Sequence, residues 1–412
     1  MTAVGFCGDW FVLSCEKKLV ALHRKKSREP FVFDCSCAEK TPKGLKKDAG
    51  SDGGPSEETG SDTVLAFAVS PSGKLAALTD DSKRLVLFEC EPSWRCISIR
   101  WVVRRCTSLT FSPAEDELLA ADKSGDLYSF SVVDPQREGG LQMGHLSMLL
   151  AAAVSPDDRF ILTADVDEKI RVSHHRSPYN IQSFCLGHQQ FVSALQIPPT
   201  HPHWLLSGSG DGTVKLWDYE SGQCLQSCDL RALEEVPGSD PDKDKNLAVC
   251  RLTSSPDGCH VAVLCESVST VHFFTLGREK RLVPHSRLHL PTRPLDINFD
   301  DDGRLWVLLD SGDIPLKMYA LRQNSWEHEA DHLEVTRVTE ALRPHWSTMN
   351  ASTRATDRFE HLYKVSFDNV SLYLQKKQQR LDEQQKRTKA QKPSGNKRPK
   401  TGTSRAEVQT SS

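Results

Sequence analysis

His188, Ser207 and Asp211 are the residue types of a serine-hydrolase triad, and they occur close together in this chain. In such a triad the histidine takes the proton of the serine nucleophile, and the carboxylate holds the imidazole in the required tautomer. The same side chains can instead form a buried hydrogen-bond chain, in which the N–H of a tryptophan such as Trp217 satisfies the serine hydroxyl. The choice between catalysis and structure depends on the elements that carry these residues.

A glycine-rich run from Gly208 to Gly212 is the strongest candidate for a nucleotide or S-adenosylmethionine loop. A dinucleotide fingerprint needs a strand before the glycines and a helix that opens directly after them. Here the residues from Thr213 to Leu216 alternate like a strand, so the run is interpreted as a turn. The chain also lacks a Gly-x-x-x-x-Gly-Lys-Ser/Thr phosphate loop. We therefore predict that this chain binds no cofactor.

Metal ligands are the next chemistry to consider. His174 and His175 are adjacent, and Asp300 to Asp302 form an acidic run, but exposed histidines on a blade loop more often bind nothing, and a solvated blade turn is the default for the aspartates. There is no His-Glu-x-x-His motif, and none of the close cysteine pairs has a second pair or a histidine at zinc spacing. The thirteen scattered cysteines are typical of reduced core residues in an intracellular protein. The sequence predicts no metal site.

All of these residues lie within a phrase that recurs along the chain. Each copy has a Ser-Pro turn, an apolar run, an aspartate and then alternating apolar residues. Copies begin at Ser70, Ser112 and Ser155, with degenerate copies at Pro198 and Ser255. The prolines of the first four copies are 42, 43 and 43 residues apart. A period of about 40–45 residues is typical of propeller blades, and seven blades need roughly 300–350 residues.

The repeat predicts an all-β fold, a seven-bladed β-propeller over residues 1–345, with a C-terminal helix and a disordered basic tail. Insertions at about 39–62 and 231–246 lack apolar periodicity and are predicted to be disordered. We expect an N-terminal strand to complete the last blade and close the ring. Residues 346–389 form a C-terminal extension with a helix from about 355 to 389, and 390–412 form the disordered basic tail.

The repeat decides the question raised by the triad-like residues. They occupy regular positions of the fifth copy, which ends in the Trp-Asp pair at Trp217. We therefore assign four residues to a structural hydrogen-bond chain within one blade, and we predict no catalytic residue in this chain. These four are His188, Ser207, Asp211 and Trp217.

Charge is distributed unevenly along the chain. The net charge is −3, but the stretch from Lys376 to Arg405 holds eleven Lys and Arg against two acidic residues, which leaves −12 for the rest. A mildly acidic body with a basic tail indicates that a polyanion would be held by the tail or by a partner. No signal-peptide pattern and no apolar run of bilayer length occur, so we expect no membrane association.

Charged turns occupy equivalent positions in two neighbouring blades. They run from Asp122 to Asp126 and from Asp165 to Arg171. Adjacent blades bring equivalent turns together, so these charges should share one rim. They are either solvated turns or a docking patch for a partner of complementary charge.

Several strings resemble the WD-repeat non-catalytic subunit of the tRNA guanine-N7-methyltransferase in its vertebrate form. The resemblance covers roughly residues 63–377. The strings are Asp80 to Leu85, Ala121 to Asp126, Val154 to Asp165, Asp167 to Arg171, Phe184 to His188 and Tyr363 to Val370.

The resemblance implies a heterodimer in which a catalytic partner holds S-adenosylmethionine and methylates a variable-loop guanosine of tRNA. This chain would stabilise that partner and help to position the tRNA. Arg171 would be the main anchor and pair with a partner carboxylate, whereas Val166 stands where the family commonly has arginine. The implied partner-binding residues are Lys123, Asp165, Asp167, Glu168, Lys169 and Arg171.

The basic extension has two interpretations. It contacts tRNA phosphates, or it serves only as a nuclear-import signal, for which Lys397 to Lys400 are suited. Either way we expect a nuclear protein, with a cytoplasmic pool left open. The candidate tRNA-binding residues are Lys376, Lys377, Arg380, Lys386 and Arg387.

A propeller can also serve two other functions. Substrate receptors of cullin-type ubiquitin ligases often carry Trp-Asp-x-Arg at a blade end, but Glu220 occupies the arginine position here. A reader of peptides or modified histones would need an aromatic cage, and with 7% aromatic residues, mostly at strand positions, none is evident. The ubiquitin-ligase receptor or adaptor is the alternative to the methyltransferase subunit.

Overall fold

The computed structural model describes residues 2–39, 60–234, 247–277, 279, 281–311, 315–349, 358–364, 373–374 and 376–380. The chain forms two compact units, residues 1–363 and residues 364–412. The basic tail from 390 to 412, most of both predicted insertions, and the candidate residues Lys386 and Arg387 lie outside the described residues.

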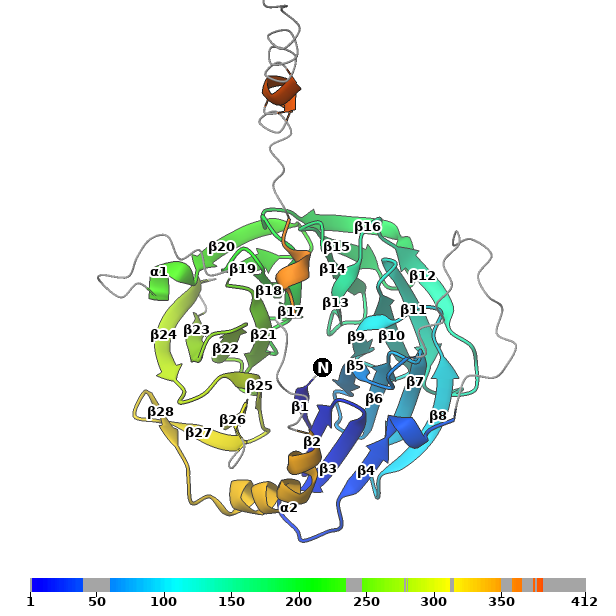
Figure 1. The fold of residues 1–412 in the computed structure, drawn as a ribbon, viewed down its shortest axis with the longest axis vertical. Helices are drawn as coiled ribbons and strands as arrows, with labels where there is room; N and C mark the ends of the chain where they lie inside the picture. Colours follow the sequence, from blue (N-terminus) through cyan, green and yellow to red (C-terminus); the bar gives the residue numbers. More distant parts are fainter. Residues whose placement is uncertain are drawn as a thin grey trace, which may run out of the picture. The chain divides into compact units, whose positions relative to one another are not determined.

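Seven four-stranded antiparallel sheets follow one another around a ring, each built from four consecutive strands (Figure 1). Blade 1 holds β1 (Ala3–Cys7), β2 (Trp10–Cys15), β3 (Lys18–His23) and β4 (Phe31–Asp34). Blade 2 holds β5 (Val64–Val69), β6 (Leu75–Asp80), β7 (Arg84–Glu89) and β8 (Arg95–Trp101). Blade 3 holds β9 (Cys106–Phe111), β10 (Glu117–Asp122), β11 (Asp126–Ser131) and β12 (Gly140–Gly144). Blade 4 holds β13 (Leu149–Val154), β14 (Phe160–Asp165), β15 (Ile170–His174) and β16 (Ser177–Cys185).

The remaining blades follow the same plan, and the predicted all-β, seven-bladed propeller is confirmed. Blade 5 holds β17 (Val192–Gln196), β18 (Trp204–Ser209), β19 (Thr213–Asp218) and β20 (Gln223–Asp229). Blade 6 holds β21 (Val249–Ser254), β22 (His260–Cys265), β23 (Thr270–Gly277) and β24 (Arg281–His289). Blade 7 holds β25 (Pro294–Phe299), β26 (Leu305–Leu309), β27 (Leu316–Arg322) and β28 (Ser325–His328). The helical elements are η1 (Cys35–Cys37), α1 (Arg231–Glu234), α2 (Leu333–Met349) and η2 (Glu360–Leu362).

The serine of the recurring phrase has the same task in four blades. Its buried hydroxyl accepts a hydrogen bond from the backbone N–H five residues later and so closes the turn between the first two strands. The N–O distances are 3.1 Å at Ser70, 3.1 Å at Ser112, 2.9 Å at Ser155 and 3.0 Å at Ser255. The repeat in the sequence is therefore a repeated turn whose backbone donor needs a partner away from water.

The apolar core lies between neighbouring sheets. Trp217 and Tyr219 of blade 5, for example, pack with Phe160 and Val172 of blade 4, and all four side chains are buried. Alternate residues of a strand face opposite sides, so each blade contributes apolar side chains to both of its neighbours. This packing makes the ring a rigid frame for the turns at its rims.

The prediction that the N-terminal strand completes the last blade is wrong. β1 pairs with β2 inside blade 1, and blade 7 has β28 as its own fourth strand. The seam between these blades is closed by side chains instead. The backbone N–H of Val4 donates to Oδ2 of the buried Asp296 at 2.7 Å, and Arg251 pairs with the other carboxylate oxygen at 3.3 Å.

Helix α2 covers the same seam and lies against β3 and β27 (Figure 1). Its buried face, with Val338, Leu342 and Trp346, packs with Phe11 of blade 1 and Trp306 of blade 7. The helix therefore staples the first and last blades together.

A buried ion network adds to this staple. Arg24 of blade 1 lies 3.3 Å from Asp300 of blade 7 and 3.4 Å from Glu334 of α2. The Arg24 and Asp300 side chains are buried, so their charges are hardly screened by solvent.

The helix predicted from about 355 to 389 does not begin where the sequence suggested, because residues 358–364 are not part of an α-helix. Helix α2 begins at Leu333 and continues through Pro344. The predicted boundary between the propeller and the C-terminal extension, at residue 345, therefore falls inside this helix. Residues 358–364 hold only the short turn η2, whereas Tyr373, Leu374 and residues 376–380 are helical. None of the helices in the described ranges is long and apolar enough to cross a membrane.

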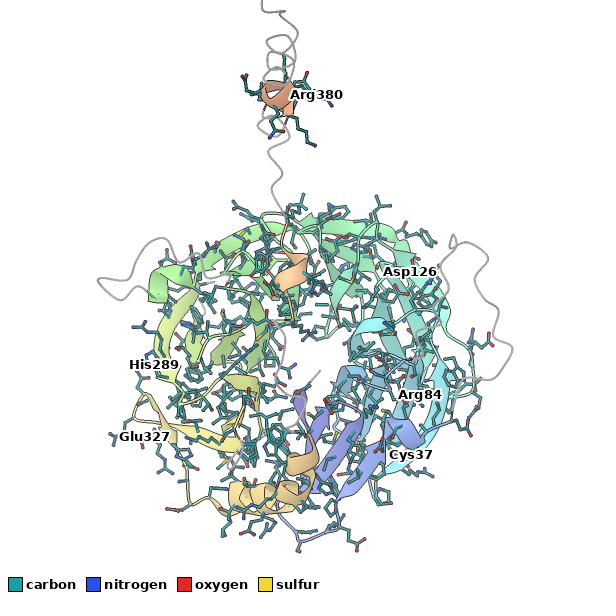
Figure 2. All side chains as sticks on the ribbon, viewed as in Figure 1. Cys37, Arg84, Asp126, His289, Glu327 and Arg380 are labelled. Atoms are coloured by element: carbon teal, nitrogen blue, oxygen red, sulfur yellow. The ribbon has the colours of Figure 1, made fainter. Side chains whose placement is uncertain are left out.

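The edges of the two predicted insertions are ordered where the structure describes them. Residues 231–234 form α1, and Asp62 forms a short ion pair with Arg84, whose position in blade 2 is marked in Figure 2.

Candidate docking surface

The triad-like residues of blade 5 form a continuous chain of hydrogen bonds. His188 Nδ1 lies 2.9 Å from Asp211 Oδ2, and His188 Nε2 lies 2.7 Å from Ser207 Oγ. The indole N–H of Trp217 donates to the same Ser207 oxygen at 2.8 Å. Ser207 and Trp217 are fully buried, so a substrate has no access to the hydroxyl. The arrangement holds together β18, β19 and the connection that precedes β17.

The surroundings of Asp211 in this hydrogen-bond chain favour its ionised form. Burial alone would raise the pKa of its carboxyl, but the hydrogen bond and charge of His188, with further hydrogen bonds from Thr213 and Gln189, lower the pKa well below the usual aspartate value.

Blade 4 contains a second copy of the network. His145 Nδ1 lies 2.9 Å from Asp165 Oδ2, and His145 Nε2 lies 2.8 Å from Thr163 Oγ1. The other oxygen of Asp165 accepts the backbone N–H of Lys169 at 3.1 Å. Asp165 is 2% exposed, so in the free chain its carboxylate shapes the turn. Its role as a partner-binding residue stays a prediction.

Two side chains of this turn, Asp167 and Lys169, are exposed, whereas Val166 and Glu168 are half-buried. Asp167 and Lys169 point outward with Oδ2 and Nζ 3.9 Å apart, and Glu168 has the positive φ of 71° that a tight turn requires. Lys123 occupies the equivalent turn of blade 3 and is also exposed. Asp126, at the end of that turn, is marked in Figure 2. Both turns join the second and third strands of their blades, so their charges lie on one side of the ring.

Arg171 is held in place without a carboxylate. Its Nε donates to Ser173 Oγ at 3.0 Å, and its two terminal nitrogens donate to the carbonyl oxygens of Gly144 at 3.1 Å and Pro178 at 2.9 Å. In the described part of the chain it makes no ion pair. Burial lowers the pKa of Arg171 from its ordinary value. A guanidinium has five N–H donors, so two remain for a bidentate carboxylate.

Exposed apolar side chains occur on the strands next to this arginine, and one of them, Phe184, lies directly opposite it in the register. Fourteen large apolar side chains of the described residues are exposed, and six of them fall between residues 141 and 186, on the outermost strands of blades 3 and 4 or directly after them. We call these six the apolar rim: Leu141, Leu146, Tyr179, Ile181, Phe184 and Leu186. A cluster of this kind, beside charged residues, marks a surface that a partner covers.

The sequence analysis missed the apolar rim, although a signal was present. Leu146 and Leu186 stand beside the Gly-His pairs of consecutive repeats, where turn residues are expected to be polar. Leu146 is fully exposed, and Leu186 is 61% exposed.

The candidate tRNA-binding residues belong to the second unit. Lys376, Lys377 and Arg380 are helical, and their side chains are exposed; Arg380 is labelled in Figure 2. The candidate metal ligands belong to the ring. His175 lies between the carboxylates of Asp158, at 2.9 Å, and Glu117, at 3.2 Å. Within the described ranges, no three His, Cys, Asp or Glu side chains are grouped so that they could hold a metal ion.

A seven-bladed ring with buried hydrogen-bond chains and an exposed, partly apolar rim defines a WD-repeat propeller that serves as a binding platform. The comparison with protein families agrees. The model of the tRNA methyltransferase TRM82 WD40 domain matches residues 16–140 and 134–336, and the chain belongs to this family.

Relatives with a curated description carry one name. A zebrafish (Danio rerio) tRNA (guanine-N(7)-)-methyltransferase non-catalytic subunit is 55% identical over 394 residues, which cover 95% of this chain and 94% of its own. The mouse (Mus musculus) protein of that name is 50% identical over 84% of this chain and 83% of its own, and the human (Homo sapiens) protein is 44% identical over 90% and 89%.

Among solved structures, a chain of the mitotic checkpoint complex superimposes with a TM-score of 0.58 at 15% identity, covering 75% of this chain and 83% of that chain. At that identity the likeness concerns the fold alone.

Proposed function

We infer that this chain is the non-catalytic subunit of a tRNA guanine-N7-methyltransferase. Membership of the TRM82 family and the names of relatives that match almost the full chain support this function. The single structural observation that carries the mechanism is Arg171, a positioned guanidinium with no carboxylate partner among the described residues, set beside the apolar rim. The role is that of a platform, and the catalytic subunit performs the chemistry.

The docking surface has an apolar and a charged part. A partner carboxylate would meet the two free donors of Arg171, and basic partner side chains would meet Asp167 and Glu168. Lys123 would attract a further acidic group. The apolar rim would be covered in the same contact and would exclude water from the arginine, which strengthens the ion pair. Charged groups of this kind fix the register of a complex as well as its affinity.

The catalytic subunit would hold S-adenosylmethionine and transfer its methyl group to guanine N7. The propeller would contribute by stabilising the loops of that subunit that must be ordered before tRNA binds. A rigid surface lowers the entropy cost of ordering a mobile loop, because the loop then has fewer conformations to lose on binding substrate. The rigid ring of interlocked blades suits this task.

The basic extension would supply contacts to the tRNA. Lys376, Lys377 and Arg380 are exposed on a helical turn, and Lys386 and Arg387 follow in the sequence. Contacts to phosphate position a nucleic acid without reading its sequence. We also propose a nuclear location, for which the basic clusters of the tail are suited.

Reconstitution tests the function directly. The chain, the catalytic subunit and their mixture are each incubated with S-adenosylmethionine and an unmodified tRNA transcript, and N7-methylguanosine is quantified by mass spectrometry. We expect product from the mixture, little from the catalytic subunit alone and none from this chain. Methyl transfer by this chain alone, or no gain on mixing, would reject the proposed function.

A further inference from the structure

The first unit ends in a short segment, residues 358–363, that is fixed on the ring by an aromatic contact. Phe359 is 3% exposed and stacks on Phe191 of blade 5, with ring centroids 5.4 Å apart and planes at 29°. Tyr363 meets the edge of the same ring at 5.1 Å. Two aromatic side chains of the segment therefore share one buried partner.

A carboxylate fixes the backbone of the same segment. Glu266, in the turn between β22 and β23 of blade 6, accepts the N–H of Arg358 at 2.6 Å and the N–H of Phe359 at 3.2 Å, one with each oxygen. Hydrogen bonds from backbone N–H groups to a carboxylate are charge-assisted and stronger than those to a neutral acceptor. The segment is therefore fixed by side-chain packing and by main-chain hydrogen bonds at once.

The apolar seat of Phe359 extends over three blades. Val166 and Leu150 come from blade 4, Phe191 directly precedes β17 of blade 5, and Ala248 and Cys250 come from blade 6. The segment crosses this part of the ring in Figure 1, where η2 lies beside β17. Val166 directly precedes Asp167, so the seat and the docking turn are parts of one rigid structure. This also gives Val166 a packing role.

We propose that residues 358–363 are an anchor that fixes the root of the basic extension beside the docking surface, with Phe359 and Glu266 as positioning residues for tRNA. The inference rests on the proposed function, because it assumes that the extension contacts tRNA. Its physical basis is the length of the tether. Nine residues separate Tyr363 from Tyr373, whereas twenty-three separate Met349 from Tyr373. Releasing the anchor therefore raises the number of residues between the ring and Tyr373 from nine to twenty-three.

The expected size of the effect follows from polymer physics. The effective concentration of a tethered group falls roughly as the −3/2 power of tether length, so lengthening the tether from nine to twenty-three residues lowers it about fourfold. This change affects how often the basic helix meets bound tRNA and leaves the chemistry of the partner untouched. The Michaelis constant for tRNA should therefore rise about fourfold when the anchor is released, with kcat unchanged.

The experiment uses the full chain in complex with its catalytic subunit and an unmodified tRNA transcript. Phe359→Ala and Glu266→Ala are compared with wild type for kcat and for the Michaelis constant of tRNA. Glu340→Ala, at an exposed position of α2, is the matched control for the carboxylate, and Phe359→Leu is the conservative variant. We expect the two alanine variants of the anchor to raise the Michaelis constant, while Phe359→Leu restores most of the affinity.

A truncated chain distinguishes an effect on the position of the extension from an effect on the fold of the propeller. Phe359→Ala is repeated in a chain that ends at Tyr363, where it should have no further effect, because the extension is already gone. The dissociation constant for the catalytic subunit should be unchanged by the anchor variants, and thermal melts should show that each variant is fully folded at the assay temperature, even where the loss of buried packing lowers its melting temperature. If truncation raises the Michaelis constant but the anchor variants do not, the anchor is rejected and the proposed function stands. If truncation itself does not change the Michaelis constant, the extension does not act on tRNA and the anchor is rejected as well. The platform role is tested separately, by the reconstitution experiment.

Discussion

Arg171 of β15 lies directly opposite Phe184 of β16 in the register of blade 4, so a half-buried guanidinium and an exposed aromatic ring share one face of the sheet. Directly opposed residues on neighbouring strands have side chains in contact distance. Arginine and aromatic residues are also the residue types that most often dominate the binding energy of protein interfaces. This pair is therefore the centre of the proposed docking surface, and Lys123, Asp167 and Glu168 form its charged border.

Arg171→Leu should weaken the complex with the catalytic subunit by about 2–5 kcal/mol, because a buried partner carboxylate would lose its counter-charge. Isothermal titration with the purified catalytic subunit measures the change. Arg159→Leu is the control, since Arg159 lies in the turn between β13 and β14, at the other end of the sheet, and already pairs with Asp157 at 3.5 Å. Equal affinities for wild type and Arg171→Leu would remove this residue from the interface.

Leu146→Ser and Phe184→Ser should each weaken the same complex by about 1–2 kcal/mol, because apolar area that the partner covers would be replaced by a polar group. Both side chains are exposed in the free chain, so its melting temperature should stay the same. Leu321→Ser, at an exposed position of blade 7, serves as the control. A loss of stability in the absence of the partner would instead assign these residues to the fold.

The ring could be predicted from the sequence because each blade needs the same turn, and the residues that form this turn recur along the chain. The serine of each phrase closes a turn whose backbone donor is buried, and this need recurs in the same place in four blades. The sequence also predicted the hydrogen-bond chain from His188 to Trp217, since all four of its residues lie in one repeat. It could not separate Asp165 from Asp167, because the burial of Asp165 depends on His145, which follows the fourth strand of the preceding blade.

The way in which the ring closes could not be predicted from the sequence, for a similar reason. The closure of the seam and the packing of α2 across it depend on contacts between residues about 300 positions apart, such as Val4 with Asp296 and Arg24 with Glu334. A single sequence carries no signal for such distant pairs, and the familiar arrangement of a shared last blade was the natural expectation. The sequence analysis missed α2, although Val338, Leu342 and Trp346 have the apolar spacing of one helix face.

Trp346→Ala should destabilise the propeller by about 3–5 kcal/mol, because a large side chain that is 2% exposed would leave a cavity at the seam. The lost indole N–H also donates to the carbonyl oxygen of Ser311 at 2.8 Å, which would lose its partner. Urea unfolding followed by circular dichroism measures the change. His361→Ala, at an exposed position outside α2, should have little effect, and a comparable loss there would argue against a staple at the seam.

Asp211→Asn should change how the stability of the propeller depends on acid. The pKa of Asp211 is lowered in the folded chain, so its ionised form contributes stability that is present above the unfolded aspartate pKa of about 4 and is lost as the pH falls toward the folded value. The variant lacks this contribution and should unfold with a flatter pH dependence below about pH 4. Thermal melts between pH 2 and pH 7, with the exposed Asp331→Asn as control, test the sign. A steeper dependence in Asp211→Asn would contradict the assignment.

Removal of the basic extension should flatten the salt dependence of tRNA binding. If about five phosphates are contacted, the logarithm of the binding constant falls by about 3.5–4.5 per tenfold increase in salt. A chain that ends at Gln375 lacks all eleven Lys and Arg of the stretch from Lys376 to Arg405, so counterion release at those phosphates disappears. Fluorescence anisotropy of labelled tRNA with the assembled complex, over a series of salt concentrations, measures both slopes. Any phosphate contacts that the catalytic subunit makes would leave the truncated complex with a smaller slope. An unchanged slope would show that the extension does not bind phosphate and would leave nuclear import as its function.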